Sequence, residues 1–225
     1  VKIDSNGYSS IMSGRDCART VRAVVKAVSA PKAKKVDLGL PSGTMWADRN
    51  VGADFPEAYG DYFAWGETEP KDNYVWDTYK LSSGSKTSLT KYNNDNNNGL
   101  VDNKTVLDLE NDAAYVNMGS EWRMPTKEEV EELQSKCTWE WSNQIGMEGF
   151  KVTGPNGNSI FLPAAGARMD IRLLHVGSSA FFWTSSLNAD YSQNAWFLGF
   201  NSNNSDYFVS NFERDYGLLV RAVAR

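Results

Sequence analysis

The sequence PTKEEVEELQSKC, residues 125–137, and the strands and turns that follow it indicate the fold class. Thr126 and Glu129 have the spacing of a capping box, in which the two residues satisfy each other's free backbone N–H groups at a helix start. Three apolar residues then recur at helical spacing, and they are Val130, Leu133 and Cys137. We therefore predict a helix here, with Cys137 most simply a core residue.

A second helix is expected over residues 106–118, where apolar positions face one side and acidic positions the other. From Thr138 onward the pattern changes to strand and turn. Residues 150–152 and 160–162 flank the turn 154–157, which predicts a hairpin. Later strands are expected near residues 181–185, 195–200, 206–210 and 218–223. Two helices on one side of many short antiparallel strands, with long loops, make an α+β fold.

The region before the helices is rich in turns and loops. Short aromatic strands and tight turns are expected over residues 36–66, and residues 67–105 are polar and irregular. The Asn-rich run 93–98 could supply oxygen ligands to calcium, but it lacks the spaced acidic ligands of a calcium loop. A flexible surface loop is the better interpretation.

The composition is typical of one soluble globular domain plus a short extension. The chain has 225 residues, of which 41% are hydrophobic and eight are Trp, which is ample for a packed core. The net charge of -5 argues against a nucleic-acid or anionic-membrane partner, and no apolar run is long enough to cross a bilayer. Cys17 and Cys137 could form one disulfide or none. The chain starts at Val1 without a signal-peptide pattern, so we expect a processed or trimmed product.

The N-terminal 30 residues form a region of their own, with a predicted strand at 20–25 and a linker of small residues. Arg15-Asp16 and the run 21–24 have the same spacing as Arg214-Asp215 and the run 220–223. Two explanations stay open: this region is the tail of an upstream tandem copy, or two similar strands lie side by side in one sheet. The main domain is then expected to span residues 31–225.

The last 58 residues, 168–225, contain no lysine, although the other 167 contain thirteen. Asn, Ser, Gly and aromatic residues are abundant there instead. Recognition surfaces favour Tyr, Ser, Gly and Asn, because aromatic rings provide contact area at low cost in rotamer entropy and small polar residues adapt their hydrogen bonds. The C-terminal quarter therefore has the composition of a binding surface.

Five motifs stand in order along the chain: VDLGLPSG (36–43), WA (46–47), GDYFAWGE (60–67), WRMPT (122–126) and LPAAG (162–166). Together they resemble the Fibrobacter succinogenes major paralogous domain family, which is common in Bacteroidetes. The resemblance covers residues 36–225. It implies a C-type-lectin-like fold related to the formylglycine-generating enzyme group, on a secreted or cell-surface bacterial protein whose anchor would lie in a segment outside this sequence.

The tail resembles the variable region of proteins diversified by a diversity-generating retroelement. In such systems a reverse transcriptase mutates template adenines, chiefly in Asn codons, and an Asn codon ending in C or T never yields Lys, Gln, Glu, Met or Trp. This would account for the missing lysines, with Trp183 and Trp196 in the fixed frame and Gln193 and Glu213 as departures. The resemblance implies a ligand-binding face made by the residues that this mechanism could generate: Ile171, Arg172, Leu174, His175, Phe181, Tyr191, Phe197, Gly199, Asp206, Phe208, Phe212, Asp215 and Tyr216.

Strand alternation gives a physical expectation for this face. Phe197 and Gly199 alternate with Leu198 and Phe200, so we expect one pair to face inward and the other outward. An exposed Phe197 beside Phe212 and Tyr216 would form an apolar patch of the kind that a monomer seldom shows without a use. The alternative is that these aromatic residues fill the core of a loop-rich domain. Three charged residues are expected to tune the surface, and they are Arg172, Asp206 and Asp215.

Catalytic and metal chemistry have little support in the sequence. His175 is the only histidine, and no other His or Cys lies near it, so a surface contact is expected rather than a base or a ligand. Asp206, Glu213 and Asp215 could bind a cation, yet solvated or partner-facing carboxylates are commoner. Arg168 and Arg221 are expected to pair with structural carboxylates or carbonyls.

The two cysteines give little support to an enzymatic function. Relatives of the formylglycine-generating type act through activated thiols, but Cys17 lies in the N-terminal extension and Cys137 in a helical apolar stripe. The calcium-dependent lectin motifs are matched poorly by Glu69-Pro70-Lys71 and Trp76-Asp77. We therefore expect a non-enzymatic, receptor- or adhesin-like protein with a diversified face, no cofactor or metal, and a protein or glycan ligand. A static carbohydrate-binding or adhesive domain is the alternative, and a formylglycine-generating-type enzyme is less favoured.

Overall fold

The computed structural model describes residues 32–202 and 206–224. The expectations for residues 1–30, including the strand at 20–25 and both explanations of its similarity to the chain end, lie outside the described residues. Cys17 lies outside them too, so a pairing with Cys137 stays open. No helix in the described residues is long and apolar enough to cross a membrane.

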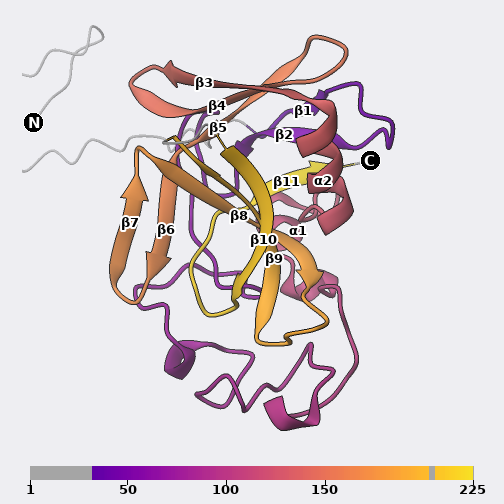
Figure 1. The fold of residues 1–225 in the computed structure, drawn as a ribbon, viewed down its shortest axis with the longest axis vertical. Coiled ribbons are helices and arrows are strands. Elements are labelled where there is room, and N and C mark those ends of the chain that lie inside the picture. Colours follow the sequence, from indigo (N-terminus) through magenta and orange to yellow (C-terminus); the bar gives the residue numbers. More distant parts are fainter. Residues whose placement is uncertain (1–31, 203–205, 225) are drawn as a thin grey trace, which may run out of the picture. The chain divides into compact units, whose positions relative to one another are not determined.

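Three β-sheets and two α-helices make up the described part of the chain (Figure 1). One sheet has the order β1 (Lys35–Asp37), β2 (Met45–Asn50), β11 (Arg221–Ala224). A second has the order β3 (Thr138–Gln144), β4 (Met147–Thr153), β5 (Ser159–Pro163). The largest has the order β10 (Asp206–Glu213), β9 (Asn194–Asn201), β8 (Ser179–Leu187), β6 (Ala165–Met169), β7 (Arg172–Val176). Every strand pair is antiparallel except β6 with β8, so the predicted α+β class is confirmed.

Helix α2 (Lys127–Lys136) begins as its sequence predicts. The Thr126 hydroxyl accepts a hydrogen bond from the Glu129 backbone N–H at 3.3 Å, and the Glu129 carboxylate accepts one from the Thr126 N–H at 2.9 Å. Val130 and Leu133 are buried, and the half-buried Cys137 at the helix end packs against the same core. The helix lies against β8, β9 and β10, so it covers one face of the largest sheet.

The helix expected over residues 106–118 is shorter than predicted. Only α1 (Ala113–Met118) is α-helical, and a 3-10 turn (Leu109–Asn111) precedes it. The Leu107 N–H donates to the Ser185 carbonyl at 3.0 Å, so the start of the segment pairs with β8 instead. Asp112 then caps α1, because its side chain accepts from the N–H groups of Ala114 and Tyr115.

The predicted hairpin is present as β4 and β5, with Phe150 opposite Leu162 and Val152 opposite Ile160. The strands expected near 181–185, 195–200 and 206–210 are β8, β9 and β10. The strand expected over 218–223 is only partly regular: β11 begins at Arg221, whereas Leu218 and Leu219 form isolated bridges.

The largest sheet is covered on both faces. Leu198 and Phe200 of β9 belong to one buried cluster, and Phe197 belongs to a second cluster. The second cluster is fixed by two buried indoles: the Trp183 N–H donates to the Phe63 carbonyl and the Trp65 N–H to the Thr184 carbonyl, both at 2.8 Å. The frame around the C-terminal strands is therefore held by contacts to the segment that contains residues 60–67.

The Asn-rich loop forms several local side-chain hydrogen bonds. Asn93 is fully buried, and its side-chain amide donates to the carbonyls of Asp95 and Leu100. The Asp102 carboxylate accepts the backbone N–H groups of Tyr92 and Asn93, both at 2.9 Å. Local side-chain bonds of this kind substitute for regular secondary structure in loops.

Candidate functional site

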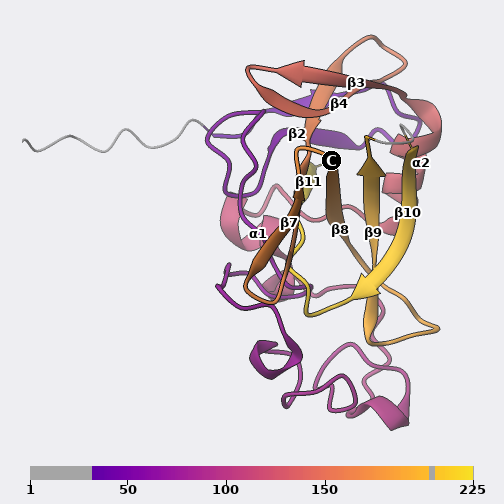
Figure 2. The same ribbon diagram turned by 60° about the vertical axis from the view of Figure 1, so that its left-hand side comes forward.

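Strand pairing brings several predicted contact residues to one face of the largest sheet. Phe181 of β8 lies opposite Gly199 of β9, which lies opposite Phe208 of β10. Since alternate residues of a strand share a face, Phe197 and Phe212 lie on the same face as this row. Figure 2 shows β8, β9 and β10 as neighbouring strands, with β7 on the other side of β8.

The rings on this face contact one another. The Phe197 ring centroid lies 5.7 Å from that of Phe181, 6.0 Å from that of Phe208 and 5.4 Å from that of Phe212. Tyr216, just after β10, adds a fifth ring at 4.9 Å from Phe212. Most of these pairs are edge-to-face, the geometry that the ring quadrupole favours. We call Phe181, Phe197, Phe208, Phe212 and Tyr216 the aromatic face.

Gly199 makes room for the centre of the aromatic face. A Cβ atom built at this position would lie 2.8 Å from the Phe197 ring and 2.9 Å from the Phe208 ring. Both distances are shorter than any ordinary carbon contact. The absence of a side chain therefore allows the two rings to converge over the β9 backbone.

The expectation that Phe197 is exposed is wrong. Its exposed fraction is 3%, because other rings of the aromatic face cover it and the buried Trp183 also packs against it. Leu198 and Phe200 on the opposite face are buried as well, so alternation does not separate an inward pair from an outward pair here. The accessible rim consists of Phe208, 36% exposed, and the half-buried Phe181, Phe212 and Tyr216.

Four predicted contact residues lie elsewhere. Ile171, Arg172, Leu174 and His175 are on or beside β7, at the opposite edge of the sheet from β10. Leu174 is half-buried and the other three are exposed. The structure therefore does not join them to the aromatic face.

Three further candidates lie near the ends of β9 and β10. Tyr191, in the turn between β8 and β9, is 62% exposed, and Asp206 is exposed at the start of β10. The expectation that Asp215 tunes the charge of the surface is wrong, because this residue is only 3% exposed. Burial and the neighbouring charge of Glu213 raise the pKa of Asp215 to about 7, and its Oδ1 atom is buried without a hydrogen-bond partner among the described residues.

Arg214 is an anchoring residue that the sequence did not reveal. It is fully buried, and its guanidinium group donates to the Tyr79 hydroxyl at 2.9 Å and lies 4.9 Å from the Trp65 ring centroid. Its other donors bind three backbone carbonyls at 2.9–3.0 Å, those of Lys91, Tyr92 and Ser192. The arginine thus ties the end of β10 to the polar loops. The only feature that could have indicated it was the repeated Arg-Asp pair.

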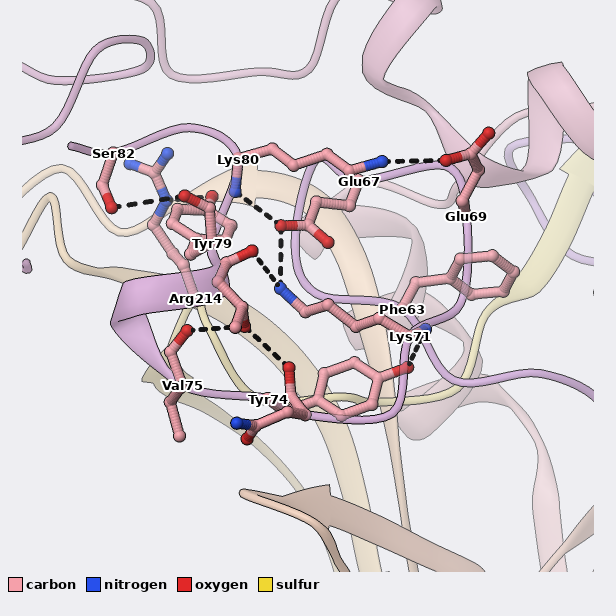
Figure 3. A network of polar contacts seen from close by, with 12 residues as sticks. Phe63, Glu67, Glu69, Lys71, Tyr74, Val75, Tyr79, Lys80, Ser82 and Arg214 are labelled. Carbon is pink, nitrogen blue, oxygen red and sulfur yellow. Dashed lines mark hydrogen bonds and ion pairs between the residues drawn. The ribbon is translucent and has the colours of Figure 1, made fainter. Parts of the chain in front are cut away.

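Figure 3 shows the polar network beside Arg214. Glu67 is buried, and one of its carboxylate oxygens accepts from the Lys71 ammonium at 2.9 Å and from the Lys80 backbone N–H at 2.8 Å. Lys71 also donates to the Thr78 carbonyl at 3.0 Å. The Tyr74 hydroxyl donates to the Tyr62 carbonyl at 2.6 Å. These contacts fix the segment after residue 66, for which the sequence predicted only a polar, irregular chain.

The two arginines expected to pair with structural groups behave differently. Arg221 is buried and donates to the Asn50 side-chain oxygen at 2.8 Å and to the Phe161 carbonyl at 2.7 Å, as expected, and burial lowers its pKa to about 9. For Arg168 the expectation is wrong: within residues 32–202 and 206–224 its side chain has no ion pair or hydrogen bond. Its guanidinium group lies 5.5 Å from the Tyr62 ring centroid instead.

The aromatic face is suited to non-covalent contact. Its one polar group is the Tyr216 hydroxyl, whose pKa is raised by burial and by the charges of Glu213 and Asp215. Burial also raises the pKa of the Cys137 thiol to about 11, so this thiol is protonated at neutral pH. In the described part of the chain no group of three or more His, Cys, Asp or Glu residues could hold a metal ion.

Comparison of the chain with protein-family models, with curated proteins and with solved structures found no match. The geometry of the aromatic face and the sequence motifs are therefore the features that bear on function.

Proposed function

We propose that this chain is a non-enzymatic ligand-binding protein of the bacterial exterior whose C-terminal face is diversified by a retroelement. The observation that carries the proposal is the clustering of the candidate residues. Six of the thirteen come together on one face of β8, β9 and β10, although they are spread over residues 181–216, and they are Phe181, Phe197, Gly199, Phe208, Phe212 and Tyr216.

The proposed fold is C-type-lectin-like, of the Fibrobacter succinogenes major paralogous domain family. The motif residues support it because they build the frame of the domain. Trp46 and Trp65 are buried, Phe63 pairs with Leu218, and the motif 122–126 leads directly into the capping box of α2. Motifs with such structural roles are the part of a binding scaffold that must stay constant while the contact residues vary.

In the proposed mechanism the rim of the aromatic face contacts a protein or glycan ligand. Phe208, Phe212 and Tyr216 provide rigid apolar area, and the exposed Asp206 lies on the same strand as the first two. Phe197 and Gly199 form the floor beneath them. Binding then depends on shape and on hydrogen bonds at the rim, as at antibody surfaces.

The test is to sequence the 3′ end of the coding region across many cells of the source population. We expect substitutions at Phe208, Phe212 and Tyr216, with Trp183 and Trp196 unchanged as internal controls. A near-copy of this 3′ end beside a reverse-transcriptase gene should accompany them. An invariant tail would overturn the diversification, and the static carbohydrate-binding alternative would then be tested on a glycan array.

A further inference from the structure

A second candidate site is a pocket of about 330 Å³. Its walls come from the chain segments 60–62 and 70–74 and from Arg168 of β6. Residues 217–218 bring Arg168 and the segment 60–62 together. The Arg168 backbone pairs with Gly217 at 2.8 and 2.9 Å, and the backbone of Phe63, next to that segment, pairs with Leu218 at 2.9 and 3.0 Å. The pocket shares no residue with the aromatic face.

Arg168 brings a positive charge without a matching anion. The side chain is half-buried and contacts the Tyr62 ring, and it forms no ion pair with any residue that the structure describes. A guanidinium group has five N–H donors in a planar fork that matches a carboxylate. The contact with the tyrosine ring restricts the guanidinium group and leaves its N–H groups free to donate.

Asp61 brings a negative charge without a matching cation. It is half-buried, and no described side chain donates to its carboxylate. The carboxylate lies against Gly52, where a built Cβ atom would come within 2.2 Å of Oδ2. Burial raises the pKa of Asp61, which is the penalty of holding a carboxylate away from water without a partner. A bound cation would relieve that penalty.

Lys71, a third charged residue of the pocket wall, already has a carboxylate partner. The Lys71 ammonium donates to the Glu67 carboxylate, as Figure 3 shows, and it also donates to the Thr78 carbonyl. The Lys71 N–H also donates to the Tyr74 hydroxyl at 3.2 Å. This network holds the wall in place before any ligand arrives, so ordering it costs little on binding.

We propose that this pocket binds a small zwitterion, with the ligand carboxylate on Arg168 and the ligand ammonium on Asp61. The two residues have opposite charge, line the same pocket and form no ion pair with each other. A ligand with both charges compensates both groups at once, whereas a simple anion or cation leaves one half-buried charge unpaired. The exposed Asp72 at the rim adds attraction for the ammonium group.

The test is isothermal titration calorimetry of the whole chain with L-alanine, γ-aminobutyrate and 6-aminohexanoate, which separate the two charges by increasing distances. Butyrate and butylammonium are the matched single-charge probes. We expect at least one zwitterion to bind at least about tenfold more tightly than either single-charge probe. No zwitterion binding, or equal binding of a single-charge probe, would overturn the proposal.

Variants then assign the two charges. Arg168→Gln and Asp61→Asn should each weaken zwitterion binding by about tenfold or more, whereas the exposed controls Lys136→Gln and Asp190→Asn should not change it. Circular dichroism checks the fold of each variant. If R168Q does not fold, Arg168→Lys takes its place, because lysine keeps the charge but lacks the fork, and weaker binding is again expected. Unchanged affinity in the folded variants would contradict the assignment.

Discussion

Replacing Phe197 by alanine separates a core role from a contact role within the aromatic face. The side chain is 3% exposed and its ring touches four other rings, those of Phe181, Trp183, Phe208 and Phe212. Removing a buried phenylalanine ring usually costs about 3–5 kcal/mol of unfolding free energy, since apolar contact is lost and a cavity remains. We expect a value near the lower end, about 3 kcal/mol, because the rim rings can partly collapse into the space.

Phe208→Ala is the matched control, because it removes the same ring from the same sheet face at a position that is 36% exposed. Its expected cost is about 1 kcal/mol, since much of that ring is already in contact with water. Urea unfolding followed by far-UV circular dichroism measures both, with the m-value checked for constancy. Equal costs in the two variants, or a loss below about 1 kcal/mol for F197A, would show that Phe197 is a surface residue after all.

Two further predictions concern buried charge. Asp215 binds a proton with a pKa of about 7 in the folded chain against 3.8 for the ordinary group, so the folded state holds a proton that the unfolded state has lost. Between those pH values the unfolding free energy should therefore fall as pH rises, by up to about 1.4 kcal/mol per pH unit. Asp215→Asn should remove this slope. Urea unfolding at pH 4–7 measures it, and identical slopes in the wild-type chain and the variant would contradict the reasoning. Arg214→Met should cost about 3–5 kcal/mol, because three carbonyls and the Tyr79 hydroxyl lose a buried donor. An R214M variant that unfolds at the wild-type urea concentration would show that the anchor is dispensable.

The sequence predicted well those helices and strands that are determined by residues close to one another along the chain. The capping box of Thr126 and Glu129 and the apolar spacing of α2 lie within a few residues of one another, so no distant contact was needed to predict the helix. The hairpin of β4 and β5 has its turn residues between its two strands in the same way. The helix expected from residue 106 failed because Leu107 bonds to Ser185, which is far along the chain, and that pairing overrides helical propensity.

The alternation of side chains along β9 was predicted correctly, but the burial of the candidate residues was not. Strand alternation correctly placed Phe197 and Gly199 on one side of β9 and Leu198 and Phe200 on the other. The exposure of a sheet face depends on which distant segments pack against it, and the alternation within one strand does not predict that packing. Asp215 shows the same limit, because only the folded chain reveals that its carboxylate is buried.

The folded chain separates the groups that hold the sheet from the groups that line its accessible rim. Buried donors fix the strands from the segments before residue 93: Trp65 bonds to β8, Trp183 of β8 bonds back to Phe63, and Arg214 binds the loop at 91–92. None of these contacts involves the side chains of Phe208, Phe212 or Tyr216. Those rim rings can therefore change without removing a bond of the frame. Phe197 differs, because it lies between the rim and the frame, so a polar residue there would be buried without a partner.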